Sequence, residues 1–339
     1  MVSLRKVMGD DMLVDTFGRK ITYLRISVTD RCNFRCVYCM PPGGITQQSH
    51  ESMLRYEEIY KIVQVAAENG ITEIRLTGGE PLVRSDIVSL VKMIRSVPQI
   101  EDISMTTNAL LLSNQALALK EAGLNRVNIS LDTLDPEKFQ KMTRIGSFDK
   151  VWAGILAAEA AGLQPIKLNT VVIRGMNEME IPALAHLSVE KPWNIRFIEL
   201  MPVKNQESWG DGFLSPEDAY VSKQEMLQIL QPYHLQAVHD VDGNGPAKYY
   251  RIPGAKGTIG FISPIGEKFC NECNRLRLTA DGNLRPCLLS ETEIPLREAI
   301  RKGEDILPLL QKAVLLKPDG HEISGHYSSS GRCMMQIGG

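Results

Sequence analysis

Short apolar runs alternate with longer amphipathic segments through residues 21–200. The runs are rich in Ile, Leu, Val and Thr and are bounded by turn residues, a pattern that predicts β-strands. Six strands are predicted in this way: Ile21–Val28, Ile71–Leu76, Ile103–Thr106, Val127–Leu131, Ile166–Ile173 and Ile195–Leu200. Apolar residues at helical spacing between them predict helices at Tyr56–Glu68, Ile87–Ile94, Asn114–Ala122, Pro136–Met142, Lys150–Ala161 and Glu178–His186.

The order of these elements indicates a parallel sheet. Parallel strands need long crossovers, which the predicted helices supply, and Ile166–Ile173 is nearly continuously apolar, as a strand buried on both faces is. We expect three helices to end at a glycine in the left-handed conformation, at Gly70, Gly123 and Gly162. Six β-to-α alternations fit either a doubly wound sheet or an incomplete barrel, because a complete barrel has eight.

Chemically distinctive residues follow the predicted strands. They are Asp30–Cys39, Thr77–Pro81, Thr106–Asn108, Asp132 and Met201-Pro202. In a barrel all such loops converge on one face, whereas a doubly wound sheet gathers only the loops at its switch point. We therefore expect an α/β protein built on an incomplete (β/α)6 TIM-like barrel.

The pattern changes near residue 205. A predicted helix at Pro216–Leu230 is followed by short strand-like runs with turn signals between them. These runs are Tyr249–Ile252, Gly257–Ile262, Leu276–Thr279 and Leu284–Pro286. We expect a barrel domain of residues 1–205 and a C-terminal α+β domain of residues 206–339.

Composition narrows the class of protein. The chain has 339 residues, 43% of them hydrophobic and 23% charged, with a formal net charge of −2. A dedicated nucleic-acid or membrane-surface binder would carry a large basic excess. The N-terminal segment has no apolar run of signal-peptide length, and no stretch approaches the about 20 apolar residues of a spanning helix. We expect a cytoplasmic protein that binds neither nucleic acid nor membrane.

The seven cysteines of the chain are clustered. Cys32, Cys36 and Cys39 form a C-x3-C-x2-C motif directly after the first predicted strand. Three thiolates on one loop can hold three irons of a cubane cluster, which leaves the fourth iron without a protein ligand. A structural zinc site would need a fourth ligand, and the nearest histidine is His50. Zinc or a disulfide is the alternative, and the spacing and the reducing compartment favour the iron–sulfur cluster.

A second triplet consists of Cys270, Cys273 and Cys287, with the spacing C-x2-C-x13-C. Cys333 could complete a zinc ribbon, so spacing alone does not choose between zinc and a second cubane with an open iron. The residues between the cysteines favour the cubane. Arg275 and Arg277 share a face of a predicted strand, and two converging guanidiniums suit a phosphate chain, although a solvated basic strand is the ordinary alternative.

Both triplets resemble known motifs. The loop TDRCNFRCVYCM is similar to the signature of the radical S-adenosylmethionine enzymes, in which three cysteines hold a [4Fe–4S] cluster and S-adenosylmethionine chelates its open iron. With the second triplet, the chain resembles the GTP 3′,8-cyclases of molybdenum cofactor biosynthesis over nearly its whole length. The likeness runs through TYLRISVTDRCNFRCVYC, TGGEPLVR, TTNA, NISLD, RFIELMP and CNECNRLRLT to a terminal diglycine, and is weakest just after Cys39.

The resemblance implies an S-adenosylmethionine site at the strand ends. The residues implied there are Tyr38, Gly79, Glu80, Ser130 and Met201. Glycine allows a close backbone approach to the ligand, and Glu80 offers an acceptor for the ligand ammonium. Ser130 would donate to the carboxylate, Met201 would pack on the adenine, and Tyr38 would present backbone groups to it. The cofactor supplies a 5′-deoxyadenosyl radical, which the protein must position and shield.

The resemblance also implies a second [4Fe–4S] cluster, whose open iron contacts the guanine of GTP, and a basic pocket for the triphosphate. A tetra-anion in a partly dry site needs several cations. The residues implied to bind GTP are Arg25, Arg75, Thr106, Lys167, Arg196, Arg275, Leu276 and Arg277. Arg25 and the tail residues Gly338 and Gly339 are the implied catalytic residues, whereas Cys333 is expected not to be a ligand.

The implied reaction is a radical cyclisation. The adenosyl radical removes a hydrogen from the 3′ carbon of the ribose, the ribose radical adds to carbon 8 of guanine, and one electron and a proton complete 3′,8-cyclo-7,8-dihydro-GTP. A homodimer, an external one-electron reductant and cyclic pyranopterin monophosphate synthase as the next enzyme are implied as partners.

Three other classes of protein are weaker alternatives. A peptide-modifying radical S-adenosylmethionine enzyme usually has more C-terminal cysteines. An iron–sulfur sensor or electron carrier would not need the Gly-Gly-Glu loop. The balance of charge opposes a zinc-dependent nucleic-acid binder.

Overall fold

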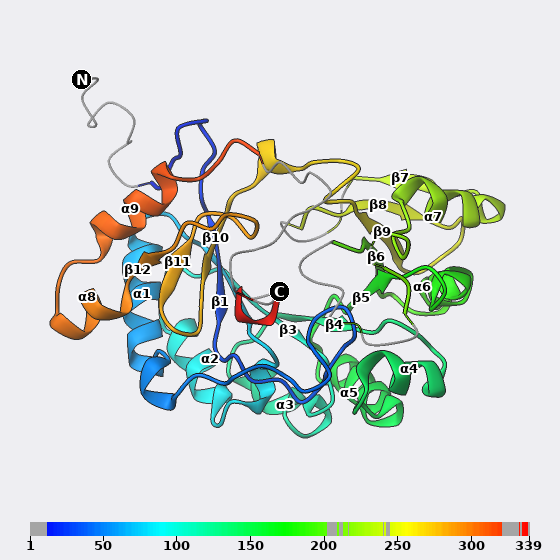
Figure 1. Ribbon diagram of the computed structural model, residues 1–339, viewed down its shortest axis with the longest axis horizontal. Helices are drawn as coiled ribbons and strands as arrows, with labels where there is room; N and C mark the ends of the chain where they lie inside the picture. The colour runs from blue at the N-terminus through cyan, green and yellow to red at the C-terminus, as the bar shows by residue number, and fades with distance from the viewer. Residues whose placement is uncertain are drawn as a thin grey trace.

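One sheet contains every named strand of the part of the chain that the structure describes (Figure 1). The computed structural model describes residues 12–201, 209, 213–215, 217–239, 241, 245–320, 332 and 334–337. The strands are β1 (Tyr23–Ser27), β2 (Glu73–Thr77), β3 (Asp102–Thr107), β4 (Arg126–Ser130), β5 (Lys167–Val172), β6 (Asn194–Glu199), β7 (Gln236–Val238), β8 (Lys248–Arg251), β9 (Thr258–Ile262), β10 (Arg275–Leu278), β11 (Asn283–Arg285) and β12 (Ile294–Pro295). Their order in the sheet is β12-β11-β10-β1-β2-β3-β4-β5-β6-β9-β8-β7.

The parallel strands lie in chain order. β1 to β6 pair consecutively and all in parallel, which confirms the six predicted strands and the α/β class. A doubly wound sheet would reverse its order at a switch point, and the order of β1 to β6 has no reversal. β9 joins β6 in parallel and β10 joins β1 in parallel. Strands from both halves of the chain therefore build the same sheet.

Helices follow the strands as predicted. They are α1 (Tyr56–Glu68), α2 (Ile87–Arg95), α3 (Ala116–Glu121), α4 (Pro136–Thr143), α5 (Phe148–Ala160), α6 (Ile181–Glu190), α7 (Lys223–Ile229), α8 (Arg297–Lys302) and α9 (Leu307–Leu315). The first six overlap the six predicted helices, and they lie along the outer side of β1 to β6 (Figure 1). Gly70, Gly123 and Gly162 have φ of 96°, 104° and 72°, which confirms the predicted left-handed ends.

The predicted helix at Pro216–Leu230 is wrong in its first half. The helix begins only at Lys223, because Ser222 accepts a hydrogen bond from the backbone N–H of Glu225 while Glu225 accepts one from the backbone N–H of Ser222. This reciprocal capping fixes a helix start. The pattern also missed the short elements β7, β12, α8 and α9, whereas the predicted runs in this half overlap β8, β9, β10 and β11.

The two faces of the sheet differ in chemistry. Residues of one parity are apolar and fully buried under the helices, such as Leu24 and Ile26 of β1. Residues of the other parity are polar, such as Arg25, which stands beside Arg277 on β10 and Arg75 on β2. Since side chains alternate across a strand, the helices cover an apolar face and leave a polar face for a ligand.

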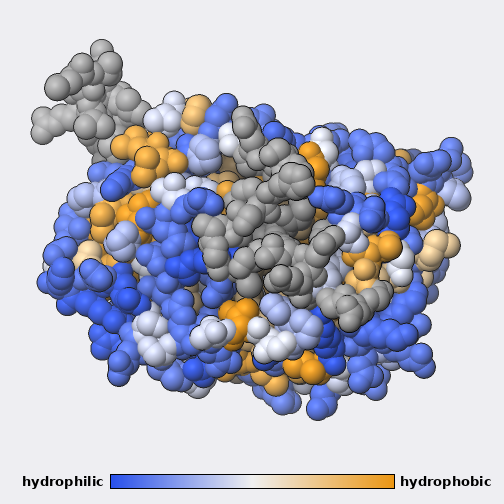
Figure 2. All heavy atoms as spheres, viewed as in Figure 1, coloured by the Kyte–Doolittle hydropathy of each residue, from blue (hydrophilic) through white to orange (hydrophobic). Residues whose placement is uncertain are grey.

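The surface seen in Figure 2 is mainly hydrophilic, with small hydrophobic groups between. Among the residues described, no helix has the length and apolar character needed to cross a bilayer.

Candidate active site

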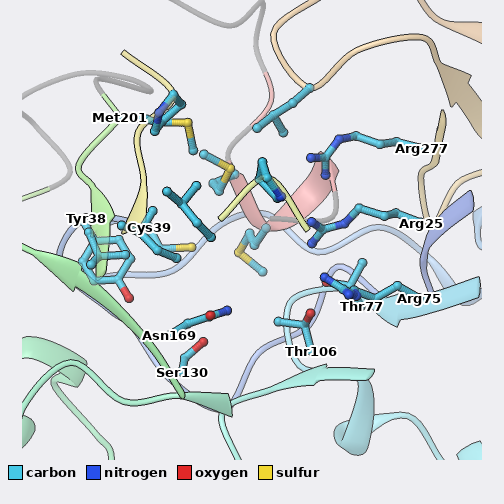
Figure 3. Close-up of a pocket in the computed structure, with 18 of the residues that line it drawn as sticks. Arg25, Tyr38, Cys39, Arg75, Thr77, Thr106, Ser130, Asn169, Met201 and Arg277 are labelled. Atoms are coloured by element: carbon cyan, nitrogen blue, oxygen red, sulfur yellow. The ribbon is translucent and has the colours of Figure 1, made fainter. Parts of the chain in front are cut away.

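A cavity of about 350 Å³ lies against the polar face of the sheet, and both cysteine triplets line it. Cys32, Cys36 and Cys39 come from the loop after β1, whereas Cys270, Cys273 and Cys287 come from the segments before β10 and after β11. Figure 3 shows Tyr38, Cys39 and Met201 on one side of this cavity and Arg25, Arg75 and Arg277 on the other. The fold therefore brings together two cysteine motifs that are far apart in the sequence.

The loop that carries the first triplet is held by the end of α4 and by the residue that follows α4. The backbone N–H groups of Arg35 and Val37 donate to the carbonyls of Thr143 and Met142 at 3.0 and 2.9 Å. Arg144, just after α4, donates to the carbonyls of Arg35 and Met40 at 2.7 and 2.9 Å. The shape of the loop is thus set by its neighbours as well as by its own sequence.

A buried carboxylate connects the same loop to the sheet. The Tyr38 hydroxyl donates to Oδ2 of Asp132 at 2.7 Å, and the Val171 N–H donates to Oδ1 at 2.9 Å. Burial raises the pKa of Asp132 to about 6, although both hydrogen bonds lower it. From the sequence, Asp132 was noted only as a residue that follows a strand. Its hydrogen bonds with Tyr38 and Val171 give it a structural role at that position.

The second triplet is assembled by a hairpin. Cys270 begins a 3-10 turn, and the N–H of Cys273 donates to the carbonyl of Cys270 at 3.1 Å. β10 and β11 are antiparallel, with Arg277 opposite Arg285. The start of β10 therefore lies beside the end of β11, so Cys273, just before β10, and Cys287, just after β11, lie at the same end of the hairpin.

The six thiols suit iron–sulfur clusters. None of the six forms a disulfide, and all six are half-buried in the cavity wall. Within the described residues, no group of three His, Cys, Asp or Glu is close enough to hold one metal ion. A cubane does not need three thiolates around one metal ion, because each thiolate binds a different iron.

Burial sets the proton affinity of the thiols. It raises the pKa of Cys32 to about 11 and the pKa of Cys36 well above its usual value. At Cys273, burial opposes ionisation, but the cations Lys317 and Arg275 outweigh it and lower the pKa. Iron binding must therefore displace protons from the first triplet, whereas Cys273 of the second is already biased towards the thiolate.

The Gly-Gly-Glu loop after β2 packs directly on the first cysteine loop. The N–H groups of Gly79 and Glu80 donate to the carbonyls of Thr29 and Arg31 at 2.9 and 2.8 Å. A Cβ at Gly78 would lie 2.6 Å from the Thr29 oxygen, and one at Gly79 would overlap the Arg31 oxygen. Both glycines are therefore required by the close approach of two backbones.

Glu80 is a buried carboxylate in this loop. It accepts hydrogen bonds from the N–H groups of Leu82 and Asn108, at 3.1 and 2.6 Å, and from the Thr107 hydroxyl at 2.6 Å. Burial nevertheless raises its pKa to about 7. An ammonium group beside Glu80 would favour the ionised carboxylate. Glu80 was predicted from the sequence as an acceptor for the ammonium of a ligand.

Ser130 and Met201 also line the cavity, and Asn169 lines it next to Ser130 (Figure 3). Ser130 pairs with Asn169 in the register of β4 and β5. Oδ1 of Asn169 is buried and has no hydrogen-bond partner among the residues that the structure describes. Asn169 was not predicted from the sequence. The only indication was that it is a polar residue two positions after Lys167 in a strand that is almost wholly apolar.

Five arginines line the cavity, and three of them lie on the side opposite Cys39 and Met201 (Figure 3). The five are Arg25, Arg75, Arg196, Arg275 and Arg277. Burial and the repulsion of Arg275 lower the pKa of Arg277 to about 10. Burial, with the neighbouring Arg277 next, lowers the pKa of Arg25 well below its usual value. Several buried guanidinium groups close together are stabilised by a bound anion. This part of the cavity is therefore suited to a polyphosphate.

Not every predicted residue reaches the cavity. Thr106 lines it, but Lys167 does not, although it lies buried on the polar face next to Asn128. Leu276 is packed in the hydrophobic core, because it has the opposite parity to its two arginine neighbours on β10. Tyr23 was missed: it lines the cavity, with the Arg75 guanidinium 5.3 Å above its ring.

The last described segment also enters the cavity. Met334 and Met335 line it, and Met335 lies against Gly79. Arg332 donates to the Asp281 carboxylate at 2.8 and 3.1 Å and to Glu293 at 2.7 Å. Gly338, Gly339 and Cys333 lie outside the described residues.

Comparisons with known proteins agree with this geometry. Residues 26–188 match the family described as the Radical SAM superfamily, and residues 193–323 match Molybdenum Cofactor Synthesis C. The crystal structure of Streptococcus suis SuiB bound to S-adenosylmethionine superposes with a TM-score of 0.61 at 15% identity, over 87% of this chain and 66% of SuiB. At that identity the likeness shows the fold alone.

The cysteine-lined cavity on a parallel sheet therefore defines a radical S-adenosylmethionine enzyme, whose cofactors are S-adenosylmethionine and iron–sulfur clusters. Two curated relatives narrow the class further. GTP 3′,8-cyclase of Petrotoga mobilis is 48% identical over 96% of this chain and 100% of its own length, and that of Pelotomaculum thermopropionicum is 49% identical over 96% and 99%. The chain belongs to the GTP 3′,8-cyclase family.

Proposed function

We propose that this chain converts GTP into 3′,8-cyclo-7,8-dihydro-GTP, the first step of molybdenum cofactor biosynthesis. A bond forms between the 3′ carbon of the ribose and carbon 8 of guanine. The observation that carries the proposal is the single cavity lined by two cysteine triplets and five arginines. A radical generator, a purine-binding metal and a triphosphate site are the three parts that this cyclisation needs.

We also propose the finer architecture. The sheet from β1 to β6 curls into an incomplete (β/α)6 barrel, for which the sequential parallel order is support. Residues 1–205 form the radical S-adenosylmethionine part, and residues 206–339 form the part that holds the second cluster and the substrate.

The first triplet, Cys32, Cys36 and Cys39, holds a [4Fe–4S] cluster whose fourth iron is open for S-adenosylmethionine. When bound, these groups supply the radical chemistry that removes a ribose hydrogen. The chain positions the cofactor through Tyr38, Gly79, Glu80, Ser130 and Met201. Glu80 takes the ammonium of the cofactor, because it is the buried carboxylate at the close approach of the two loops.

The second triplet, Cys270, Cys273 and Cys287, holds another [4Fe–4S] cluster that contacts the purine of GTP. The arginines described above neutralise the triphosphate and orient it by paired hydrogen bonds, and Arg25 is the proposed catalytic residue among them. Arg196 is already fixed for this task, because it donates to Asn128 at 2.6 Å. The remaining proposed contacts are Thr106, Lys167, the backbone of Leu276, and the tail residues Gly338 and Gly339.

The proposal includes three partners and a location. An external one-electron reductant supplies the electrons, and cyclic pyranopterin monophosphate synthase takes the product. The chain works as a homodimer in the cytoplasm.

The decisive experiment is anaerobic reconstitution of the full chain with iron and sulfide. With a reductant, S-adenosylmethionine and GTP, we expect 5′-deoxyadenosine and the cyclised nucleotide in equal amounts by mass spectrometry. No 5′-deoxyadenosine in the presence of GTP would overturn the proposal. As matched controls, Cys333→Ala should keep the about eight irons of two cubanes, and Cys32→Ala should lose about half of them. Deletion of Gly338 and Gly339 should abolish turnover while both clusters remain.

A further inference from the structure

Lys317 is a buried lysine beside the second triplet. It is 3% exposed and follows α9. Its ammonium donates to Sγ of Cys273 at 3.4 Å and to the carbonyls of Arg275 and Pro286 at 2.8 and 3.0 Å. Pro286 immediately precedes Cys287, so one cation connects the segments of two cysteines of the triplet.

Arg19 makes the same kind of contact with the remaining cysteine of the triplet, Cys270. It is 8% exposed and forms an ion pair with Asp15 at 2.5 Å. Its guanidinium donates to the carbonyl of Cys270 at 2.6 Å. It also donates to the carbonyls of Pro318 and Asp319 at 2.6 and 3.0 Å. Arg19 therefore fixes the first cysteine of the triplet and the two residues that follow Lys317.

Together these contacts link the three cysteine segments of the second triplet to one another. Arg19 holds the Cys270 segment, Lys317 holds the Cys273 and Cys287 segments, and residues 317–319 join the two cations. The cysteines come from segments on either side of a hairpin, and Arg19 comes from the opposite end of the chain. Five of the six donor contacts go to backbone carbonyls, so the cations fix the path of the chain itself.

We propose that Arg19 and Lys317 form a two-cation clamp that positions the three thiolates of the second triplet and raises the reduction potential of the cluster they hold. The inference rests on the proposed function, which places that cluster at Cys270, Cys273 and Cys287. Neither residue touches the first triplet in the described part of the chain. The clamp is therefore a positioning device for one cluster only.

Two physical effects support the clamp. A cubane with three thiolates is an anion that becomes more negative on reduction, so a buried cation at hydrogen-bond distance from one sulfur favours the reduced form. Because fixed donors already hold these carbonyls, the loop also loses less conformational entropy when the cluster assembles. The first effect requires the charge of Lys317, whereas the second requires only its hydrogen bonds, and variants can separate the two.

The test measures each cluster in isolation. The second cluster is measured in the Cys32→Ala, Cys36→Ala, Cys39→Ala background, and the first in the Cys270→Ala, Cys273→Ala, Cys287→Ala background. In the former, Lys317→Met should lower the ratio of reduced to oxidised cluster at fixed potential about tenfold, or about 59 mV for one electron, in an EPR redox titration. Lys317→Arg, which keeps the charge, should restore most of this ratio. An unchanged potential in Lys317→Met would overturn the clamp.

Arg19→Gln tests the positioning role. We expect the second cluster to lose iron to a chelator about tenfold faster, with the first cluster unaffected. Arg95→Gln is the matched control, because Arg95 also donates to carbonyls, but to those of Ile100 and Gly123 and not to that of a cysteine. Equal rates of iron loss in the Arg19 and Arg95 variants would contradict the clamp. Wild-type chain with only about four irons would instead contradict the proposed function.

Discussion

The hydroxyl of Tyr38 donates a hydrogen bond of 2.7 Å to the buried carboxylate of Asp132. Tyr38 lies between two cysteines of the first triplet, and Asp132 lies just after β4. Because Asp132 also accepts from Val171 on β5, one carboxylate joins the cysteine loop to two neighbouring strands.

Tyr38→Phe removes this hydrogen bond and should lower the free energy of unfolding of the cluster-free chain by about 1–3 kcal/mol, since Asp132 loses a partner while it stays buried. Tyr60→Phe is the control, because the Tyr60 hydroxyl contacts Ser96 at an exposed site. We expect the control to change stability by less than about 0.5 kcal/mol in urea unfolding. Equal losses in the two variants would show that the Tyr38–Asp132 contact does not hold the loop.

Glu80 predicts a dependence of stability on pH. Burial raises its pKa to about 7, so the folded chain binds this proton more tightly than the unfolded chain. Its contribution is fully present below the ordinary pKa of a glutamate and is lost as the pH rises through about 7.

We expect the free energy of unfolding to fall over this interval by at most roughly 3 kcal/mol on account of Glu80, as measured by urea unfolding of the cluster-free chain. Glu80→Gln should remove this part of the slope. A smaller slope of the same sign should remain, because burial also raises the pKa of Asp132, to about 6. A slope identical to that of the wild type would contradict the assignment.

Gly79→Ala should be destabilising and should prevent S-adenosylmethionine from binding. The new Cβ would overlap the Arg31 carbonyl oxygen, which belongs to the loop of the first triplet. Backbone atoms cannot yield as a flexible side chain can, so we expect a loss of about 2–4 kcal/mol in thermal unfolding. Gly43→Ala is the control, with no atom within 4 Å of the new Cβ, and it should be neutral or slightly stabilising.

Arg277 and Arg285 form a matched pair, because they stand opposite each other on β10 and β11. Arg277 lines the cavity, and burial and neighbouring Arg275 lower its pKa to about 10. Arg285 is fully buried and forms an ion pair with Glu293 at 2.5 Å.

Arg277→Met should therefore stabilise the ligand-free chain by about 1–3 kcal/mol while it weakens GTP binding at least about tenfold. Arg285→Met should instead destabilise the chain by about 3 kcal/mol, because it breaks a buried ion pair. Urea unfolding and calorimetric titration with GTP measure the two effects. If Arg277→Met destabilised the ligand-free chain, the repulsion between Arg277 and its neighbouring cations would not lower the stability as we infer.

The sequence alone was enough to predict the elements of the first half of the chain. Each of β1 to β6 falls on an apolar run, and its helix falls on a segment of helical period, so local pattern and tertiary structure agree there. The cysteine triplets were also predictable, because cluster ligands have restricted spacings. The convergence of Arg275 and Arg277 followed from strand parity alone.

Other features depend on contacts that have no local signal. α7 is shorter than its pattern because Ser222 and Glu225 cap it. Leu276 was grouped with its arginine neighbours, although parity places it in the core. Arg19 and Lys317 were not singled out at all, since each acts on carbonyls far away in the sequence and a lone cation carries no pattern.

The position of β1 has a consequence for how the protein matures. β1 pairs with β2 on one side and with β10 on the other, and β10 belongs to the last quarter of the chain. During synthesis at about 5–20 residues per second, the β10 side of β1 stays open for tens of seconds after the first cysteine loop has emerged. The order of translation therefore leaves the loop of Cys32, Cys36 and Cys39 without the neighbouring β10 while Cys270, Cys273 and Cys287 are not yet made.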